Sequence, residues 1–235
     1  MTMKRFSLWL MAALFCGSTT VQAQLKPGSF CITPKLGFLS ASLTNMPDLP
    51  INETDGIKRA IFPGFLIGAE CEYQLTDMFS VSAGLNYTRQ GSKWQNYSRP
   101  DLGYEIRNLQ TALGYVNLPI MANVYLFKGF AIRAGVQLGY LTNANTYYNI
   151  TYKNWDKKWG EQPKDDEVDE NIWSECNKLD LTIPLGISYD LTENITIGAS
   201  YHLGLTRMNK EEDPDGDLLN RGILVTIGYR YPIDF

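Results

Sequence analysis

The chain contains a single histidine, His202, and a serine two positions before it, Ser200. Serine and histidine side chains can form nucleophile–base pairs, and a carboxylate such as Asp180 or Asp190 could orient the imidazole. Residues i and i+2 of a strand lie roughly 7 Å apart, which is too far for the hydrogen bond that such a pair needs. We therefore interpret His202 as a hydrogen-bonded structural residue and predict no catalytic residue. A lipid-modifying enzyme centred on His202 is the alternative.

The cysteines and acidic clusters show no metal-binding pattern. Outside the N-terminal export segment, which contains Cys16, the sequence has three cysteines: Cys31, Cys71 and Cys176. An odd number argues against a disulfide framework, and no Cys-x-x-Cys motif suggests zinc. The acidic residues at 165–170 and 213–217 do not have the spacing of a calcium-binding loop. We predict neither a metal nor a cofactor.

Charged residues occupy polar positions in segments where polar and apolar residues alternate. They are Lys35, Glu70, Glu72, Arg133, Lys178, Asp180, Asp190 and Arg230. Both signs are present, and an unpaired charge in a poorly solvated interior is costly. We expect these side chains to face the inside of a closed sheet and to form a salt-bridge network there. Glycines at equivalent positions, such as Gly68 and Gly135, leave room for them.

Eight alternating segments must position these side chains. They are residues 30–42, 61–75, 78–91, 112–127, 130–145, 176–191, 195–208 and 220–232. Each is longer than the roughly 9–11 residues that a tilted strand needs to cross the hydrocarbon layer. The sequence therefore predicts an all-β fold over residues 24–235: an eight-stranded antiparallel up-and-down transmembrane β-barrel with its apolar face against lipid. Side chains can just fill a lumen of eight strands, so we predict a plugged interior.

The connections between the segments alternate in length. Three are short turns, and Gly129 in one of them can supply a positive φ. Four are long and polar: residues 43–60, 92–111, 146–175 and 209–219. Outer-membrane barrels have short periplasmic turns and long outer loops. We therefore expect both termini to lie in the periplasm.

The N-terminus has the features of an export signal. Lys4 and Arg5 precede an apolar run that is too short to span a bilayer as a helix, and Ala23 ends a cleavage-type sequence. We predict a signal peptide over residues 1–23, and hence the outer membrane as the location. The formal net charge of -4 and the pI of about 5.1 give no basic footprint for nucleic acid.

The third long loop, residues 146–175, is rich in aromatic and acidic residues. Its tryptophans are Trp155, Trp159 and Trp173. Aromatic side chains can stack on sugars or on partner proteins, which makes these residues candidates for a surface binding site. They could equally lie near the membrane interface in a solvated loop.

Several motifs along the chain resemble the PorT-like outer-membrane β-barrel family. The most specific is Tyr115-Val-Asn-Leu-Pro-Ile120, and others are at residues 64–73, 85–91, 186–190, 201–206 and 228–231. The resemblance implies a small barrel related in architecture to the OmpA and OmpX types, and a link to type IX secretion. Phe235 ends the chain as in substrates of the barrel insertion machinery, although Pro232 interrupts the final strand pattern.

These observations favour a non-enzymatic outer-membrane barrel with a structural or interaction role through its outer loops. The expected partners are outer-membrane lipid, the insertion machinery, and a surface or secretion-complex protein. Alternatives are a narrow porin-like channel for small solutes, a component of a type IX secretion or gliding complex, and the lipid-modifying enzyme.

Overall fold

A computed structural model describes residues 25–44, 49–52, 55–57, 59–99, 103–153, 161–210 and 217–233. The predicted signal peptide, residues 1–23, lies outside the described residues, as do Trp155 and Trp159. Within the described residues, no helix is long and apolar enough to span a membrane.

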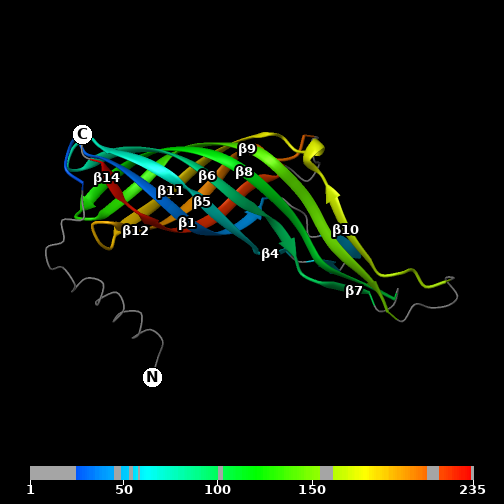
Figure 1. The fold of residues 1–235 in the computed structure, drawn as a ribbon. Helices are drawn as coiled ribbons and strands as arrows, with labels where there is room; N and C mark the ends of the chain where they lie inside the picture. The colour runs from blue at the N-terminus through cyan, green and yellow to red at the C-terminus, as the bar shows by residue number, and fades with distance from the viewer. Residues whose placement is uncertain are drawn as a thin grey trace, which may run out of the picture.

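Eight antiparallel strands form a closed ring (Figure 1). In ring order they are β1 (Phe30–Leu43), β5 (Phe62–Gln74), β6 (Phe79–Trp94), β8 (Tyr104–Phe127), β9 (Phe130–Tyr152), β11 (Leu179–Asp190), β12 (Ile195–Arg207) and β13 (Leu219–Tyr229). The register Leu36↔Ile227 closes the ring between β1 and β13. A short strand, β14 (Tyr231–Ile233), continues β13 along β1, with Pro232 opposite Cys31. The predicted eight-stranded barrel is confirmed.

Short turns join the strands at one end of the barrel, which we call the turn end; the opposite end is the loop end. Two of these turns are stabilised by the same kind of hydrogen bond. The hydroxyl of Thr76 accepts a hydrogen bond from the Phe79 amide, and the hydroxyl of Thr192 accepts one from the Ile195 amide. Gly129 has the positive φ, 76°, that was expected in the third turn.

The two faces of the strands differ as the alternation predicts. Leu85 is 62% exposed on the outer face of β6, whereas its neighbour Asn86 is 4% exposed inside. The same contrast separates Ile223, 55% exposed, from Leu224, 5% exposed, on β13. Large exposed apolar side chains in a ring are suited to lipid contact. The assignment of the apolar face to the outside is therefore confirmed.

The connections at the loop end contain more strand than predicted. β8 and β9 continue beyond the barrel, flanked by β7 (Tyr97–Arg99) and β10 (Asp166–Asn171). These four strands form a sheet that projects from the loop end and that we call the loop-end sheet (Figure 1). The prediction of residues 92–111 and 146–175 as loops was wrong for 104–111 and 146–152, where pairs such as Ile106↔Ile150 continue the β8–β9 ladder. Residues 100–102 and 154–160 of these predicted loops lie outside the described residues.

Smaller elements complete the loop end. β2 (Leu49–Asn52) and β3 (Asp55–Ile57) form a hairpin, and β4 (Arg59–Ala60) pairs with β6. A 3-10 turn, η2 (Trp173–Glu175), follows β10 and leads into β11. In the described part of the chain, β10 pairs with β9 alone and therefore forms an edge of the loop-end sheet.

Candidate functional site

The turn half of the lumen contains a buried ion triad. Lys35 Nζ lies 2.5 Å from Glu70 Oε2, and the guanidinium of Arg133 binds the other carboxylate oxygen. Arg133 Nε also donates to Asn123 Oδ1 at 2.8 Å. Glu70 is 6% exposed, so β1, β5 and β9 bring three charges together in the buried interior. Such a group is stable only when every charge has a partner, as it has here.

A second ion group lies beside the triad. Arg230 donates two hydrogen bonds to Asp190, at 2.7 and 2.8 Å, and its guanidinium is 3.8 Å from Glu72. Glu72 also accepts hydrogen bonds from Ser80 at 2.5 Å and Tyr125 at 2.7 Å. Six of the eight charged residues predicted to line the lumen are thus in these two groups.

Asp180 is buried without a cation. Its carboxylate accepts hydrogen bonds from Thr182 at 2.7 Å, Asn220 at 3.0 Å and Thr206 at 3.2 Å. No lysine or arginine in the described residues forms a salt bridge with it. The expectation that every lumen charge joins an ion network was wrong for Asp180, because three neutral donors from β11, β12 and β13 satisfy this carboxylate instead.

Lys178 is not part of the interior network either. It precedes β11, and its ammonium group lies 3.4 Å from the centroid of the Trp173 ring and donates to the Trp173 carbonyl. Desolvation lowers the pKa of this ammonium group, and the positive charge of Lys210 lowers it further. The strand alternation does not extend to Lys178, because regular β11 pairing begins only at Leu179.

Apolar side chains close the lumen at the loop end, which sequence reasoning missed. The buried cluster consists of Leu43, Leu113, Tyr115, Leu141, Ala144, Cys176, Met208 and Leu218, and we call it the apolar plug. Cys176 Sγ lies 3.3 Å from Met208 Sδ, and burial raises the pKa of the Cys176 thiol. Trp173 Nε1 donates to the Leu141 carbonyl at 3.1 Å and fixes η2 beside the plug.

A sequence signal for the plug does exist. The inward positions of β1 change from polar to apolar toward the loop end, through Leu39 and Ala41 to Leu43. A second buried group contains Leu39, Ala41, Phe62, Leu66, Ala112 and Leu224. The expected salt-bridge network therefore fills the turn half of the lumen, whereas apolar side chains fill the loop half.

Ser200 and His202 lie closer together than predicted. Ser200 Oγ is 3.1 Å from His202 Nε2, so the two side chains form a hydrogen bond despite the spacing of their backbone positions. The prediction that they lie too far apart was wrong, because both side chains lean toward each other from the inner face of β12. Both line an interior cavity of about 50 Å³.

The cavity also contains the side-chain oxygen of Asn86, which is buried without a hydrogen-bond partner. A second cavity of about 20 Å³ lies toward the turn end. A cavity needs roughly 10–15 Å³ to contain one water molecule, so both can hold water. Lys35, Glu70 and Arg133 line both cavities and lie between them. In the described residues, no group of histidine, cysteine and acidic side chains is arranged to hold a metal.

The two faces of the loop-end sheet differ in composition. On the more polar face, Arg107 donates to Glu105 at 2.8 Å and holds the pKa of that carboxyl below its usual range. The opposite face, which we call the aromatic face, is defined by cross-strand pairs and presents partly exposed side chains: Tyr97, Tyr104, Ile106, Tyr148, Ile150, Tyr152 and Val168. At its β10 edge this face also contains the exposed Asp166, which lies opposite Ile150, and the more polar face contains Tyr147, which lies opposite Asp169. The even-numbered residues of β9 from Ala144 to Tyr152 point to the same side of the strand, so the aromatic face continues into the apolar plug at Ala144.

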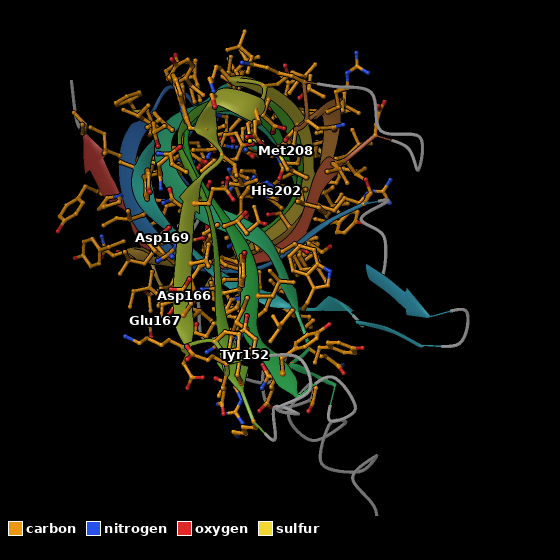
Figure 2. All side chains as sticks on the ribbon, turned by 90° about the vertical axis from the view of Figure 1, so that its right-hand side faces the viewer. Tyr152, Asp166, Glu167, Asp169, His202 and Met208 are labelled. Carbon is orange, nitrogen blue, oxygen red and sulfur yellow. The ribbon has the colours of Figure 1, made fainter. Side chains whose placement is uncertain are left out.

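Figure 2 looks into the barrel from its loop end. Met208 and His202 lie at the ring, whereas Tyr152 and the acidic residues of β10, including Asp166, Glu167 and Asp169, lie on the projecting loop-end sheet. Asn145 and Asn149 of β9 donate hydrogen bonds to Asp169 and Glu167. Of the tryptophans predicted for surface binding, the structure places only Trp173, and it lies at the mouth of the barrel.

Comparison with known proteins identifies the family. The model of the outer membrane protein beta-barrel domain matches residues 22–209. The comparison with curated proteins gives no match. Among solved structures, the chain is similar to Ail, the attachment invasion locus protein of Yersinia pestis, with 13% identity over 87% of this chain and 99% of that one and a TM-score of 0.43.

Two further solved structures are similar in the same way. Neisserial surface protein A is 13% identical over 86% of this chain and 97% of that one, with a TM-score of 0.42. Outer membrane protein W of E. coli is 14% identical over 88% of this chain and 99% of that one, with a TM-score of 0.33. Since the family model covers most of the residues, the chain belongs to the outer membrane protein beta-barrel domain family.

Proposed function

We propose that this barrel is a non-enzymatic interaction protein of the outer membrane, which binds another protein through the aromatic face of its loop-end sheet. The observation that carries the proposal is the contrast between a filled lumen and a sheet that projects beyond it. In this proposal the signal peptide, residues 1–23, is removed, the turn end and both termini lie in the periplasm, and the loop-end sheet reaches the cell exterior.

The chemistry of the aromatic face supports a protein partner. Tyrosine side chains give large contact areas at low entropic cost and are enriched at protein interfaces. Tyr104 and Tyr152 lie opposite each other, next to the Ile106–Ile150 pair, so these four side chains form one contiguous surface. Interfaces concentrate their binding energy in such clusters.

Photo-crosslinking in intact cells tests this proposal. A photoreactive amino acid at Ile150, on the aromatic face, should give an adduct with a second protein. The matched control is the same amino acid at Asn149, which is adjacent in sequence but on the more polar face and bonded to Glu167. No adduct at position 150, or equal adducts at 149 and 150, would contradict the proposal. Identification of the adduct also shows whether the partner belongs to a type IX secretion complex, as the resemblance to PorT-like barrels suggests.

A narrow channel is the second candidate, because two water-sized cavities flank the ion triad. On this proposal, movement of the triad and the apolar plug would join the cavities into a water path. The refolded full chain in a planar bilayer decides between the candidates. A silent membrane supports the interaction role, and discrete, reproducible openings support the channel.

A further inference from the structure

A groove of about 340 Å³ lies on the outer wall of the barrel, toward the loop ends of β1, β12 and β13. Its lining includes Ser40 and Ser42 of β1, Tyr201 of β12, and Arg221 and Ile223 of β13. These strands are neighbours in the ring (Figure 1). Ligand sites start at roughly 300 Å³, so the groove is large enough to bind part of a small molecule or lipid.

The groove faces the lipid side of the wall. Ser42 lies directly opposite Arg221, and Ile223 lies opposite both Ser40 and Tyr201. Ile223 and Tyr201 are 55% and 40% exposed, as expected for outward positions. Leu43 of the apolar plug also borders the groove from inside the wall, but the side chains named above face outward and do not belong to the lumen or to the loop-end sheet.

The groove also lies where the outward positions of β1 and β13 change from apolar to polar, although Leu203 of β12, opposite Arg221, is still apolar. The next outward row toward the turn end is Phe38, Val225 and Ala199, followed by Leu36, Ile227 and Ile197. Arg221 is two residues beyond Ile223, or roughly 7 Å along the strand. A cation just beyond an apolar belt is at the depth of lipid headgroups.

Three polar side chains of the groove have unused hydrogen-bonding capacity, whereas the hydroxyl of Thr44, which also lines it, accepts a hydrogen bond from the Leu219 amide. In the described part of the chain, Arg221 forms neither an ion pair nor a side-chain hydrogen bond, and the same holds for the hydroxyls of Ser40 and Ser42. By contrast Arg207, also outward on β12, lies 3.7 Å from Asp217. No carboxylate lines the groove. The set of free donors is suited to an anionic group with several acceptor oxygens.

We propose that this groove binds the phosphate of an anionic lipid in the outer leaflet. The guanidinium of Arg221 can bind two phosphate oxygens in its planar fork, and the hydroxyls of Ser40 and Ser42 can donate to the same group. Ile223 and Tyr201 contact the first carbons of the acyl chains, because they continue the lipid-facing wall. This apolar floor favours a lipid over a free anion. The site is independent of the proposed protein partner.

Native mass spectrometry of the refolded full chain in a neutral detergent tests the site, with phosphatidic acid as the probe. We expect one bound lipid, and a loss of affinity of about tenfold or more in Arg221→Gln. Arg89→Gln is the matched control, since Arg89 is also outward-facing but does not line this groove; it should bind like the wild type. Diacylglycerol, which lacks the phosphate, should bind weakly.

Each contrary result overturns the proposal. Unchanged binding by Arg221→Gln, or an equal loss in Arg89→Gln, would show general attraction of anionic lipid to the barrel. Equal binding of diacylglycerol would remove the phosphate from the recognition. Displacement of the lipid by inorganic phosphate would assign the groove to a free anion. If Arg221→Gln does not fold, judged by heat-modifiable gel mobility, Ser42→Ala replaces it, with a smaller but measurable loss expected.

Discussion

The two halves of the lumen are filled by different physical means. In the turn half, Lys35 and Arg133 share the carboxylate of Glu70, whereas Arg230 is shared by Asp190 and Glu72, so the charges balance only when the two neighbouring groups are taken together. In the loop half, the apolar plug fills the space, and the buried Asp180 relies on neutral donors. The stability of a charged interior depends on pairing of opposite charges, whereas the stability of an apolar interior depends on how completely the side chains fill its volume. The same kind of substitution should therefore have different effects in the two halves.

The largest effect is expected for Glu70→Gln in the turn half. This change leaves Lys35 and Arg133 as two buried cations without their shared carboxylate, and breaking a buried ion group costs about 3–5 kcal/mol. Urea unfolding in lipid vesicles measures the free energy of unfolding. Lys35→Met added to Glu70→Gln should recover part of the loss, because it removes one uncompensated charge. A loss below about 1 kcal/mol would show that water solvates this half.

Leu113→Ala tests the loop half by volume alone. Leu113 is fully buried in the apolar plug, and deletion of buried leucine atoms leaves a cavity that costs about 3–4 kcal/mol. The same unfolding measurement applies. Leu113→Met, which nearly conserves volume, is the control and should cost less than about 1.5 kcal/mol. Equal costs for alanine and methionine would mean that the plug is loosely packed.

Leu185→Lys compares the lumen with the lipid side of the same wall. Leu185 is outward near the middle of β11, where a lysine facing lipid costs roughly 2–4 kcal/mol. Ser188→Thr, on the inner face beside the smaller cavity, should cost much less. Gly186 is unsuitable as the lumen control, because a Cβ there would lie 2.5 Å from the Ala199 carbonyl oxygen. Equal effects at 185 and 188 would contradict the assignment of the faces.

The smallest effect is expected for Asp180→Asn. The amide oxygen can still accept hydrogen bonds from Thr206 and Asn220, and no cation loses its partner. We expect a change below about 1 kcal/mol, far smaller than for the related Glu70→Gln change. A loss as large as that of Glu70→Gln would mean that Asp180 has a charged partner, and the contrast between the two halves would be wrong.

The sequence predicts the barrel well because strand alternation is a local property. The eight segments, their faces and the short turns follow from runs such as Val81, Ala83 and Leu85, because alternate side chains of a strand point to the same face. The extension of β8 and β9 could not be predicted in the same way. The bulge at Asn108, with φ of 56°, interrupts the alternation of β8 where it leaves the barrel.

The details of the lumen were less predictable, because they depend on side chains from distant strands. The alternation indicates that charged side chains face the inside. It does not indicate that Glu70 binds both Lys35 and Arg133, or that Asp180 has neutral partners. The Ser200–His202 hydrogen bond was missed because backbone spacing does not show how two side chains lean. The groove at Arg221 requires three strands in register, which no single segment reveals.

The edge strand β10 has a consequence for crowding in the membrane. Inside the bilayer the ring is closed, so neighbouring barrels meet there only through side chains, whereas β10 exposes backbone groups to a neighbouring molecule above it. Its six residues include the acidic Asp166, Glu167, Asp169 and Glu170 and no basic residue. Two copies that paired at this edge would place like charges across the new ladder, which is destabilising. The acidic side chains of β10 therefore disfavour edge-to-edge pairing between two copies of the chain.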